Sequence, residues 1–320
     1  MKINNSRILV AGGSGFVGIN LLKFLSKKNK NIKSTYFKKF KFKKFSNINY
    51  IKLNLEKKKN CLVACRNVDI VFMCAANSSG ASVIQERPLT HLNPNVIMNL
   101  NMLEAAHQCK VKKFIFISSN VVYPVTKNYV KENDAKFKFY YKYHVAGWTK
   151  RFLEVVCDIY SNKINNPMQT IIIRPGNLYG PYDKFEDKKS KVIPALIKKT
   201  FKKKIKVWGD GKDIKDFLYI DDFVKILLKI VNKINYFDIF NIAYGKSISI
   251  NKLLGLIIKI RKINNLDIIY DNSKPKMIPE RFISVSKIKK QFGFRPKTDI
   301  FRGLVKTINW YKNNQLKLQK

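Results

Sequence analysis

The stretch Ile8-Leu9-Val10-Ala11-Gly12-Gly13-Ser14-Gly15-Phe16-Val17-Gly18 decides the fold of this chain. Four consecutive apolar residues are typical of a strand that is buried on both faces of a parallel sheet. The glycines follow at the spacing G-x-x-G-x-x-G, and residues 19–25 then show helical periodicity. A strand, a glycine loop and a helix in this order aim backbone N–H groups and a helix N-terminus at a pyrophosphate. We therefore expect Gly12, Gly15, Phe16, Val17 and Gly18 to bind a dinucleotide.

The remaining sequence alternates between strand and helix patterns before it changes character at Pro175. Strands are predicted at 34–37, 50–53, 70–74, 113–117 and 170–173, and helices at 95–109 and 148–160. This alternation predicts an α/β fold, a Rossmann doubly wound parallel sheet, with right-handed crossovers. Shorter elements after residue 175 predict a smaller C-terminal α/β substrate-binding lobe. We expect a Rossmann domain over 1–175, to which 216–245 return, and a lobe formed by 176–215 and 246–320.

Composition narrows the class of protein. The chain has 320 residues, of which 46% are hydrophobic, and contains no apolar run of the roughly 18 residues that span a bilayer. The N-terminus enters a strand directly, without the pattern of a signal peptide. The five cysteines are odd in number and lie in apolar patterns, which favours a reducing compartment. We therefore expect a cytoplasmic protein with no membrane partner and, from the Cys61-x3-Cys65 spacing, no metal site.

The net charge of +42 raises the question of a nucleic-acid partner. Nine of the 63 basic residues are Arg, whose bidentate geometry is the one favoured for recognising bases and phosphates. The lysines are spread over the whole chain and accompany many Asn, Ile, Phe and Tyr, as an AT-rich genome would produce. We interpret the charge as a solvated surface, and expect no specific nucleic-acid partner.

The end of the second predicted strand bears on the choice of cofactor. An acidic residue there would bind the ribose 2′-hydroxyl, whereas a basic residue tolerates a 2′-phosphate. This chain has Tyr36-Phe37-Lys38-Lys39, with Lys38 as the candidate, which favours NADP while leaving NAD open. After the next strands, Asn54 is expected to contact the adenine, and Ala75 and Ala76 to flank the cofactor.

Four further segments, taken in order with the glycine loop, resemble a known family. They are residues 116–124 (FISSNVVYP), 174–181 (RPGNLYGP), 207–211 (VWGDG) and 216–222 (DFLYIDD). The chain resembles the extended short-chain dehydrogenases/reductases, also called NAD-dependent epimerases/dehydratases, that act on nucleotide sugars. Tyr123-Pro124 and residues 192–197 are most similar to the GDP-L-fucose synthase-like branch. The resemblance implies an NAD(P)-dependent epimerase, reductase or dehydratase that forms a homodimer.

The family's acid–base site joins a Ser to a Tyr with a Lys four residues later. The positive charge lowers the pKa of the phenol toward neutrality. Ser119 lies where the resemblance puts the catalytic serine, and Ser118 beside it would contact the cofactor. Pro175 would pack near the nicotinamide.

The tyrosine and lysine are ambiguous in Phe139-Tyr140-Tyr141-Lys142-Tyr143-His144-Val145-Ala146-Gly147. One register makes Tyr140 the acid and puts His144 in the lysine position. The other makes Tyr143 the acid and puts Gly147 there. Neither register has the lysine, so Lys142 or Lys150 would have to substitute, and His144 is either a site residue or structural.

Substrate contacts follow from the same resemblance. Asn177, Lys215 and Arg281 match positions that bind the sugar or its diphosphate, and Ser79 is expected to line the site. Fucose synthases carry an epimerising Cys and His where this chain has Val121 and Lys191, so the double epimerisation is not expected. The sequence thus predicts a nucleotide-sugar enzyme. The alternative is a cofactor- and nucleotide-sugar-binding protein whose turnover is impaired because the lysine is missing.

Overall fold

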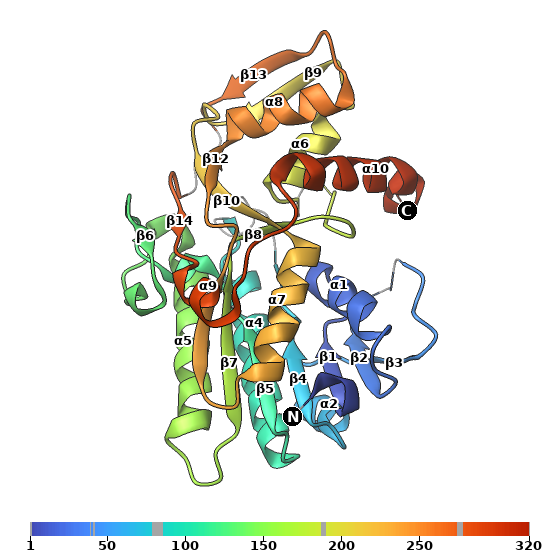
Figure 1. The fold of residues 1–320 in the computed structure, drawn as a ribbon, viewed down its shortest axis with the longest axis vertical. Coiled ribbons are helices and arrows are strands. Elements are labelled where there is room, and N and C mark those ends of the chain that lie inside the picture. The colour runs from blue at the N-terminus through green and yellow to red at the C-terminus, as the bar shows by residue number, and fades with distance from the viewer. Residues whose placement is uncertain are drawn as a thin grey trace.

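A large parallel sheet forms the centre of the molecule (Figure 1). The computed structural model describes residues 2–38, 40, 42–78, 86–186, 190–273 and 278–319. Seven strands pair in parallel in the order β11-β7-β5-β4-β1-β2-β3. Their bounds are Ile8–Ala11 (β1), Ile32–Tyr36 (β2), Ile48–Lys52 (β3), Ile70–Met73 (β4), Lys113–Ile117 (β5), Gln169–Pro175 (β7) and Asp238–Ile242 (β11). The strand order reverses between β1 and β4, and such a switch point is where open α/β sheets bind ligands.

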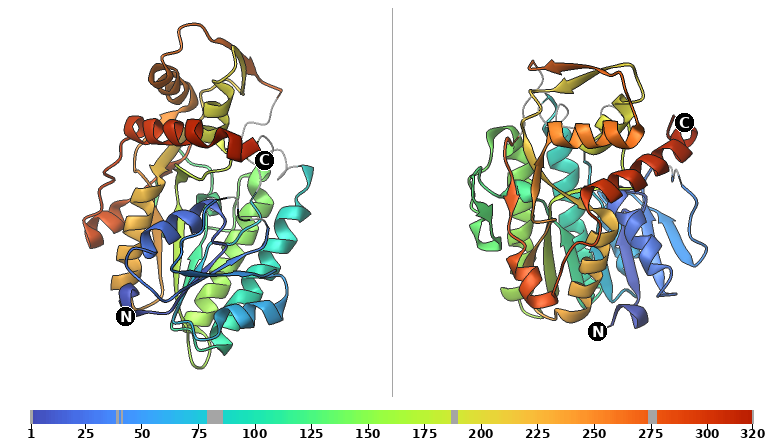
Figure 2. Two further views of the ribbon diagram at one scale, coloured as in Figure 1. Left: turned by 90° about the vertical axis from the view of Figure 1, so that its right-hand side faces the viewer. Right: turned by 45° about the horizontal axis from the view of Figure 1, so that its top comes forward.

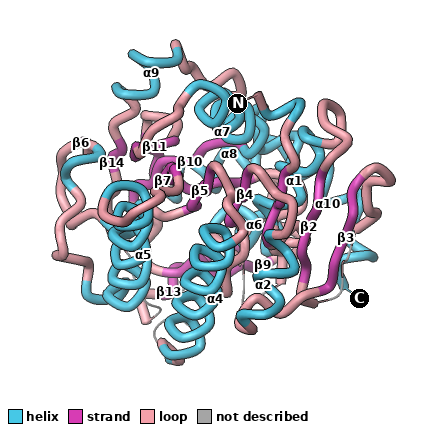
Figure 3. Tube along the Cα trace, turned by 90° about the horizontal axis from the view of Figure 1, so that it is seen from below, coloured by secondary structure: helices cyan, strands magenta, loops and turns pink. Residues whose placement is uncertain are grey.

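Two layers of helices cover the sheet, as the view along the strands shows (Figure 3). One apolar core packs α1 and α7 against the sheet through residues such as Leu21 and Phe223. The other packs α2, α4 and α5 through Cys61, Leu103 and Leu153. The bounds are Phe16–Leu25 (α1), Lys58–Cys65 (α2), Leu89–Gln108 (α4), His144–Asn162 (α5), Ile220–Lys233 (α7) and Ser286–Phe292 (α9). The predicted doubly wound fold is confirmed.

A second lobe lies over the carboxyl ends of the sheet strands (Figures 1 and 2). Its core is separate and joins residues such as Ile197, Leu253 and Leu304. Small sheets pair β12-β10-β8, β13-β9 and β14-β6. The strands are Tyr129–Val130 (β6), Asn177–Tyr179 (β8), Lys204–Trp208 (β9), Ile214–Tyr219 (β10), Ser247–Ser249 (β12), Asp267–Asp271 (β13) and Phe282–Ile283 (β14). The helices are Val192–Lys199 (α6), Ile250–Arg261 (α8) and Ile300–Gln319 (α10). Short 3-10 helices occupy Ile3–Asn5 (η1), Asn120–Val122 (η2), Glu132–Asp134 (η3) and Tyr141–Tyr143 (η4).

The predicted division at 175 and 216–245 stays a prediction, but the course of the chain is clear. β11 joins the large sheet beside β7, and α7 packs against α1. β10 pairs instead with β8 and β12 in the second lobe. Asp216 on β10 is buried and accepts hydrogen bonds from the backbone N–H groups of Tyr244 (2.8 Å) and Gly245 (2.7 Å), just after β11. One carboxylate thus joins the lobe to the sheet.

Helix α4 begins at Leu89, six residues before the predicted start at 95. Pro94 lies inside the helix and has no N–H to donate to the carbonyl of Thr90. The side-chain amide of Asn77 donates to that carbonyl instead, at 2.7 Å. Asn77, in the loop after β4, therefore supplies the hydrogen bond that the proline cannot make. The sequence around Pro94 does not predict this contact, because Asn77 is distant along the chain.

Candidate active site

The glycine loop connects β1 to α1 at the switch point of the sheet. Gly12 has φ +83°, and a Cβ on it would lie 2.6 Å from the Cα of Ala75 after β4. A Cβ on Gly18 would lie 2.3 Å from the carbonyl oxygen of Gly12. Both glycines are therefore required for the close approach of the loop to β4 and to its own helix.

The N-terminus of α1 is a ready anion site. Gly15 is the N-cap residue, and within the described chain no side chain accepts a hydrogen bond from the first turn. The N–H groups of the first turn, including those of Phe16 and Val17, have no partner inside the helix, and the helix dipole adds positive potential there. The arrangement fits a pyrophosphate. The structure thus brings the predicted residues Gly12, Gly15, Phe16, Val17 and Gly18 together beside Ala75; Ala76 is exposed next to it.

The carboxyl end of β2 carries positive charge. Lys38 is exposed two residues after the strand, as predicted. The sequence did not single out Lys44, whose Nζ lies 4.7 Å from the ring centroid of Tyr36 and 5.3 Å from that of Tyr50. The aromatic faces attract this ammonium group and hold it beside the strand end. Asn54, after β3, accepts a hydrogen bond from the N–H of Glu56 with its side chain.

The two serines after β5 have different surroundings. The Ser118 hydroxyl is buried and donates to Oε1 of Glu154 at 2.5 Å. The Ser119 side chain is partly exposed and accepts a hydrogen bond from the N–H of Val121 at 3.3 Å, which caps η2. Ser119 is therefore the hydroxyl that remains open to a ligand at the end of β5.

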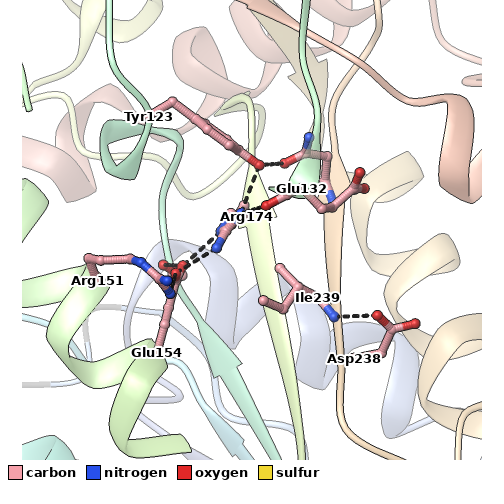
Figure 4. A network of polar contacts seen from close by, with 9 residues as sticks. Tyr123, Glu132, Arg151, Glu154, Arg174, Asp238 and Ile239 are labelled. Carbon is pink, nitrogen blue, oxygen red and sulfur yellow. Dashed lines mark hydrogen bonds and ion pairs between the residues drawn. The ribbon is translucent and has the colours of Figure 1, made fainter. Parts of the chain in front are cut away.

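A buried network fixes the ends of β5 and β7 (Figure 4). Arg174 donates to both carboxylate oxygens of Glu154, at 2.8 and 2.7 Å, and both side chains have 1% or less of their surface exposed. Arg174 also donates to the hydroxyl of Tyr123 at 3.0 Å, and that hydroxyl donates to Asn241 on β11 at 2.6 Å. The sequence analysis missed this pair, although an Arg at the end of an apolar strand was a visible signal.

Helix α5 brings Lys150 to the end of β5. Its Nζ donates to the carbonyl of Ile117 at 2.8 Å and lies 4.7 Å from the ring centroid of Phe116. Burial lowers the pKa of Lys150 to about 8, although the carboxylate of Glu154, one helical turn later, opposes this change. The residue one turn before Lys150 is Ala146, which is buried.

Tyr140 and Tyr143, the predicted acid candidates before α5, lie near Asp213. Burial raises the pKa of Tyr143 to about 12, with Asp213 and Tyr140 adding to the rise. Burial also raises the pKa of Tyr140, which has Tyr141 and Asp213 as further neighbours. Both phenols therefore keep their protons at neutral pH and face the acidic residue before β10. His144 is exposed, with its ring centroid 6.2 Å from that of Phe139 and 6.1 Å from that of Trp148.

The predicted substrate residues line the junction of the two lobes. The amide of Asn177 donates to the backbone carbonyl of Asp216 at 2.9 Å. Lys215 donates to the carboxylate of Asp213 at 3.0 Å, and burial lowers its pKa. Arg281 is 1% exposed and donates to the carbonyls of Pro124 (2.8 Å) and Tyr123 (3.1 Å).

The Arg281 guanidinium carries a buried charge that the described chain balances poorly. Burial lowers the pKa of Arg281 to about 10, and its Nε has no hydrogen-bond partner within the described residues. Lys215 contributes a second positive charge close by. Lys215 and Arg281 thus place two cations close together, and such a pair can bind a diphosphate.

Pro175 ends β7, and its carbonyl accepts a hydrogen bond from the amide of Asn120 at 2.9 Å. Ser79 lies outside the described residues. Among the residues that the structure describes, no three His, Cys, Asp or Glu side chains gather into a metal site. In the same part of the chain, no helix is long and apolar enough to cross a membrane.

The sheet order, the glycine loop at its switch point and the uncapped helix define a Rossmann-type dinucleotide-binding protein. The sequence profile of the NAD dependent epimerase/dehydratase family matches residues 8–243. The chain belongs to this family of enzymes, and the resemblance seen in the sequence is confirmed.

Individual relatives cover almost the whole chain. A GDP-L-fucose synthase from Sinorhizobium fredii is 27% identical over 326 residues, covering 98% of this chain and 97% of that protein. A GDP-L-colitose synthase from Yersinia pseudotuberculosis is 26% identical over 324 residues, covering 97% and 99%. Among solved structures, UDP-glucose 4-epimerase from Thermotoga maritima with UDP-glucose superposes with a TM-score of 0.85 at 22% identity, covering 96% and 99%. The last comparison supports the fold.

Proposed function

We propose that this chain is an NADP-dependent enzyme that moves hydride to or from a carbon of a nucleotide sugar, as an epimerase, reductase or dehydratase. One observation carries the proposal. The glycine loop, Ser119 and Lys150 all lie at the carboxyl edge of the three adjacent strands β1, β4 and β5. A cofactor whose pyrophosphate binds at α1 would extend along this edge toward Ser119.

NADP is favoured over NAD by the charge at the end of β2. Lys38 and Lys44 are proposed to bind a ribose 2′-phosphate there, and residues 36–39 contain no acid that would repel it. Asn54 is proposed to contact the adenine. NADPH supplies a hydride when bound; the chain's own residues orient the sugar oxygen and move its proton.

Lys150 is proposed to perform the task that the family gives to its lysine. Its ammonium group is held at the end of β5, where it can bind the nicotinamide ribose and raise the local positive potential. In this interpretation the lysine is present and the tyrosine one turn earlier is replaced by Ala146. Tyr140 and Tyr143, protonated at neutral pH, are proposed as hydrogen-bond donors to the sugar from outside the helix, with Ser119 as a third donor. His144 is exposed, and no contact of its imidazole supports a catalytic role within the described chain.

The substrate's diphosphate is proposed to bind at Lys215 and Arg281, with Asn177 and Ser79 contacting the sugar. The unpartnered Nε of Arg281 supports this assignment because a buried donor without an acceptor is costly. Val121 and Lys191 cannot perform the Cys and His chemistry of a fucose synthase, so we propose a different reaction from that double epimerisation.

A second candidate function is cofactor and nucleotide-sugar binding with little turnover. Ala146 favours it, because a methyl group in the tyrosine position transfers no proton. Calorimetry with NADPH and NADH, followed by a turnover screen on GDP-, UDP- and dTDP-sugars, separates the two. Tight NADPH binding with turnover supports the enzyme, binding without turnover supports the second candidate, and no binding of either cofactor contradicts both.

A homodimer in the cytoplasm is part of the proposal. Trp148 and Phe152, one turn apart on α5, and Ile97 on the adjacent α4 expose about two-fifths of their surface: 41%, 42% and 41%. These side chains form an apolar surface on two packed helices, which a second copy would cover. All five cysteines are free, as in a reducing compartment.

A further inference from the structure

If Lys150 performs the task of the family's lysine, as proposed above, the position one turn earlier on helix α5 has no proton-transfer group. Lys150 is in place at the end of β5, but the side chain one turn earlier is the methyl group of Ala146. A hydroxyl proton must leave the sugar whenever hydride leaves its carbon. A base from another element has to accept that proton if turnover occurs.

His91 lies in the first turn of α4, and α4 packs against α5. Its backbone carbonyl accepts a hydrogen bond from the amide of Asn95 at 2.5 Å. Asn95 also exchanges two hydrogen bonds with the backbone of Asn77, at 2.8 and 3.0 Å. These bonds hold the first turn of α4 against the loop that follows β4, and the imidazole of His91 lies beside the backbone of Asn77 in that loop.

The Nδ1 atom of His91 is buried and has no hydrogen-bond partner among the residues that the structure describes. Burying an imidazole nitrogen without a partner is unfavourable, and native structures rarely tolerate it without a reason. A ligand hydroxyl that hydrogen-bonds this nitrogen supplies such a reason. The other two histidines, His107 and His144, are at different positions: Nε2 of His107 meets the carbonyl of Asn166, and His144 is exposed.

The charges around His91 favour the proton-accepting form. Burial lowers the pKa of His91, the ammonium of Lys150 lowers it further, and only the backbone of Asn77 acts in the opposite direction. The other titratable groups near Lys150 are Glu154 and the thiols of Cys157 and Cys74. Burial raises the pKa of both thiols, to about 12 for Cys74. The imidazole is therefore neutral at pH 7 and can accept a proton, whereas the phenols of the tyrosines can only donate one.

We propose that His91 is the base that accepts the hydroxyl proton of the nucleotide sugar, from the end of α4 that lies near Lys150. An oxidised nicotinamide, when bound, would supply the oxidant and accept the hydride that leaves the sugar carbon. The O–H bond breaks at the same carbon, its proton goes to Nδ1 of His91, and the remaining electrons form the carbonyl. In the reducing direction the imidazolium returns the proton. This inference rests on the proposed function and names the group that performs its proton transfer.

The test uses the whole chain with His91→Gln, and His107→Gln as the matched control on a partly exposed histidine at the other end of α4. Cofactor affinity is measured by calorimetry with NADP⁺, and turnover on GDP-, UDP- and dTDP-hexoses with a hydroxyl or a keto group at C4. We expect His91→Gln to lower kcat by about 10²- to 10⁴-fold and to remove the acidic limb of the pH profile. The affinity for NADP⁺ should change by less than about twofold, and His107→Gln should match the wild type.

A direct readout does not depend on finding the substrate. The chain has three histidines, so NMR of the imidazole nitrogens can follow each one with assignment by the Gln variants. We expect the His91 signals to titrate below those of His144, to rise in pKa in Lys150→Met, and to shift when NADP⁺ and a nucleotide sugar are added. Unmoved His91 signals, or a loss of kcat in His144→Gln but not in His91→Gln, would overturn the proposal. Failure of the wild type to bind either cofactor would instead contradict the proposed function.

Discussion

Replacing Glu154 by glutamine removes the charge that balances the buried guanidinium of Arg174. The two side chains are 0% and 1% exposed and share two hydrogen bonds of 2.8 and 2.7 Å. Removing one partner of such a pair leaves an uncompensated buried charge, and typically costs about 3–5 kcal/mol. With an unfolding entropy of roughly 2 cal/mol/K per residue for a chain of this length, this corresponds to a fall in Tm of about 5–7 °C.

The matched control is Glu104→Gln. Glu104 pairs with Lys58 at 2.5 Å, but the two side chains are 38% and 53% exposed. An exposed pair is worth about 1 kcal/mol or less, so Tm should fall by less than about 2 °C. The double variant Glu154→Gln/Arg174→Met should recover part of the loss because neither charge is then buried alone. Thermal unfolding followed by circular dichroism measures all three, and equal Tm values for the two glutamine variants would refute the reasoning.

Three other predictions concern separate parts of the molecule. Gly12→Ala should abolish NADPH binding in calorimetry, because the new methyl group meets Ala75 at 2.6 Å and the backbone has φ +83°; retained affinity would contradict this. Burial lowers the pKa of Lys113 to about 8, so its protonated form is disfavoured in the folded state. The free energy of unfolding should therefore rise with pH between about 8 and 10.5 relative to Lys113→Met in urea titrations, and parallel curves would argue against it. Trp148→Glu should yield monomers in analytical ultracentrifugation, because the new charge lies on the proposed dimer surface. Trp208→Glu, at a similarly exposed tryptophan, should leave the dimer intact. If both variants remain dimeric, the α4–α5 surface is not the dimer interface.

The nucleotide-binding half of the fold can be predicted from the sequence, because the residues that define it are close together along the chain. Residues 8–18 hold the strand, the turn and the helix start in one continuous stretch, so spacing alone predicts how Gly12 and Gly18 are used. Strand ends were predicted to within two residues wherever the strands are apolar runs, as at 113–117.

The arrangement of the acid–base residues could not be predicted from the sequence, because it depends on contacts between segments that are distant along the chain. Tyr140 and Tyr143 were natural candidates by spacing, yet Lys150 is the residue that the packing of α5 on the sheet brings to Ile117. Nothing in the local pattern reports which turn of a helix meets the end of a strand. His91 was not singled out for the same reason, since its surroundings come from α5 and from Asn77.

The bond between Asp216 and the N–H groups of residues 244 and 245 has a mechanical consequence. The chain leaves the second lobe after β10 and returns to it after β11, and this return is tied to β10 by the one carboxylate. We therefore expect Asp216 to hold the second lobe in a fixed position relative to the carboxyl end of β11.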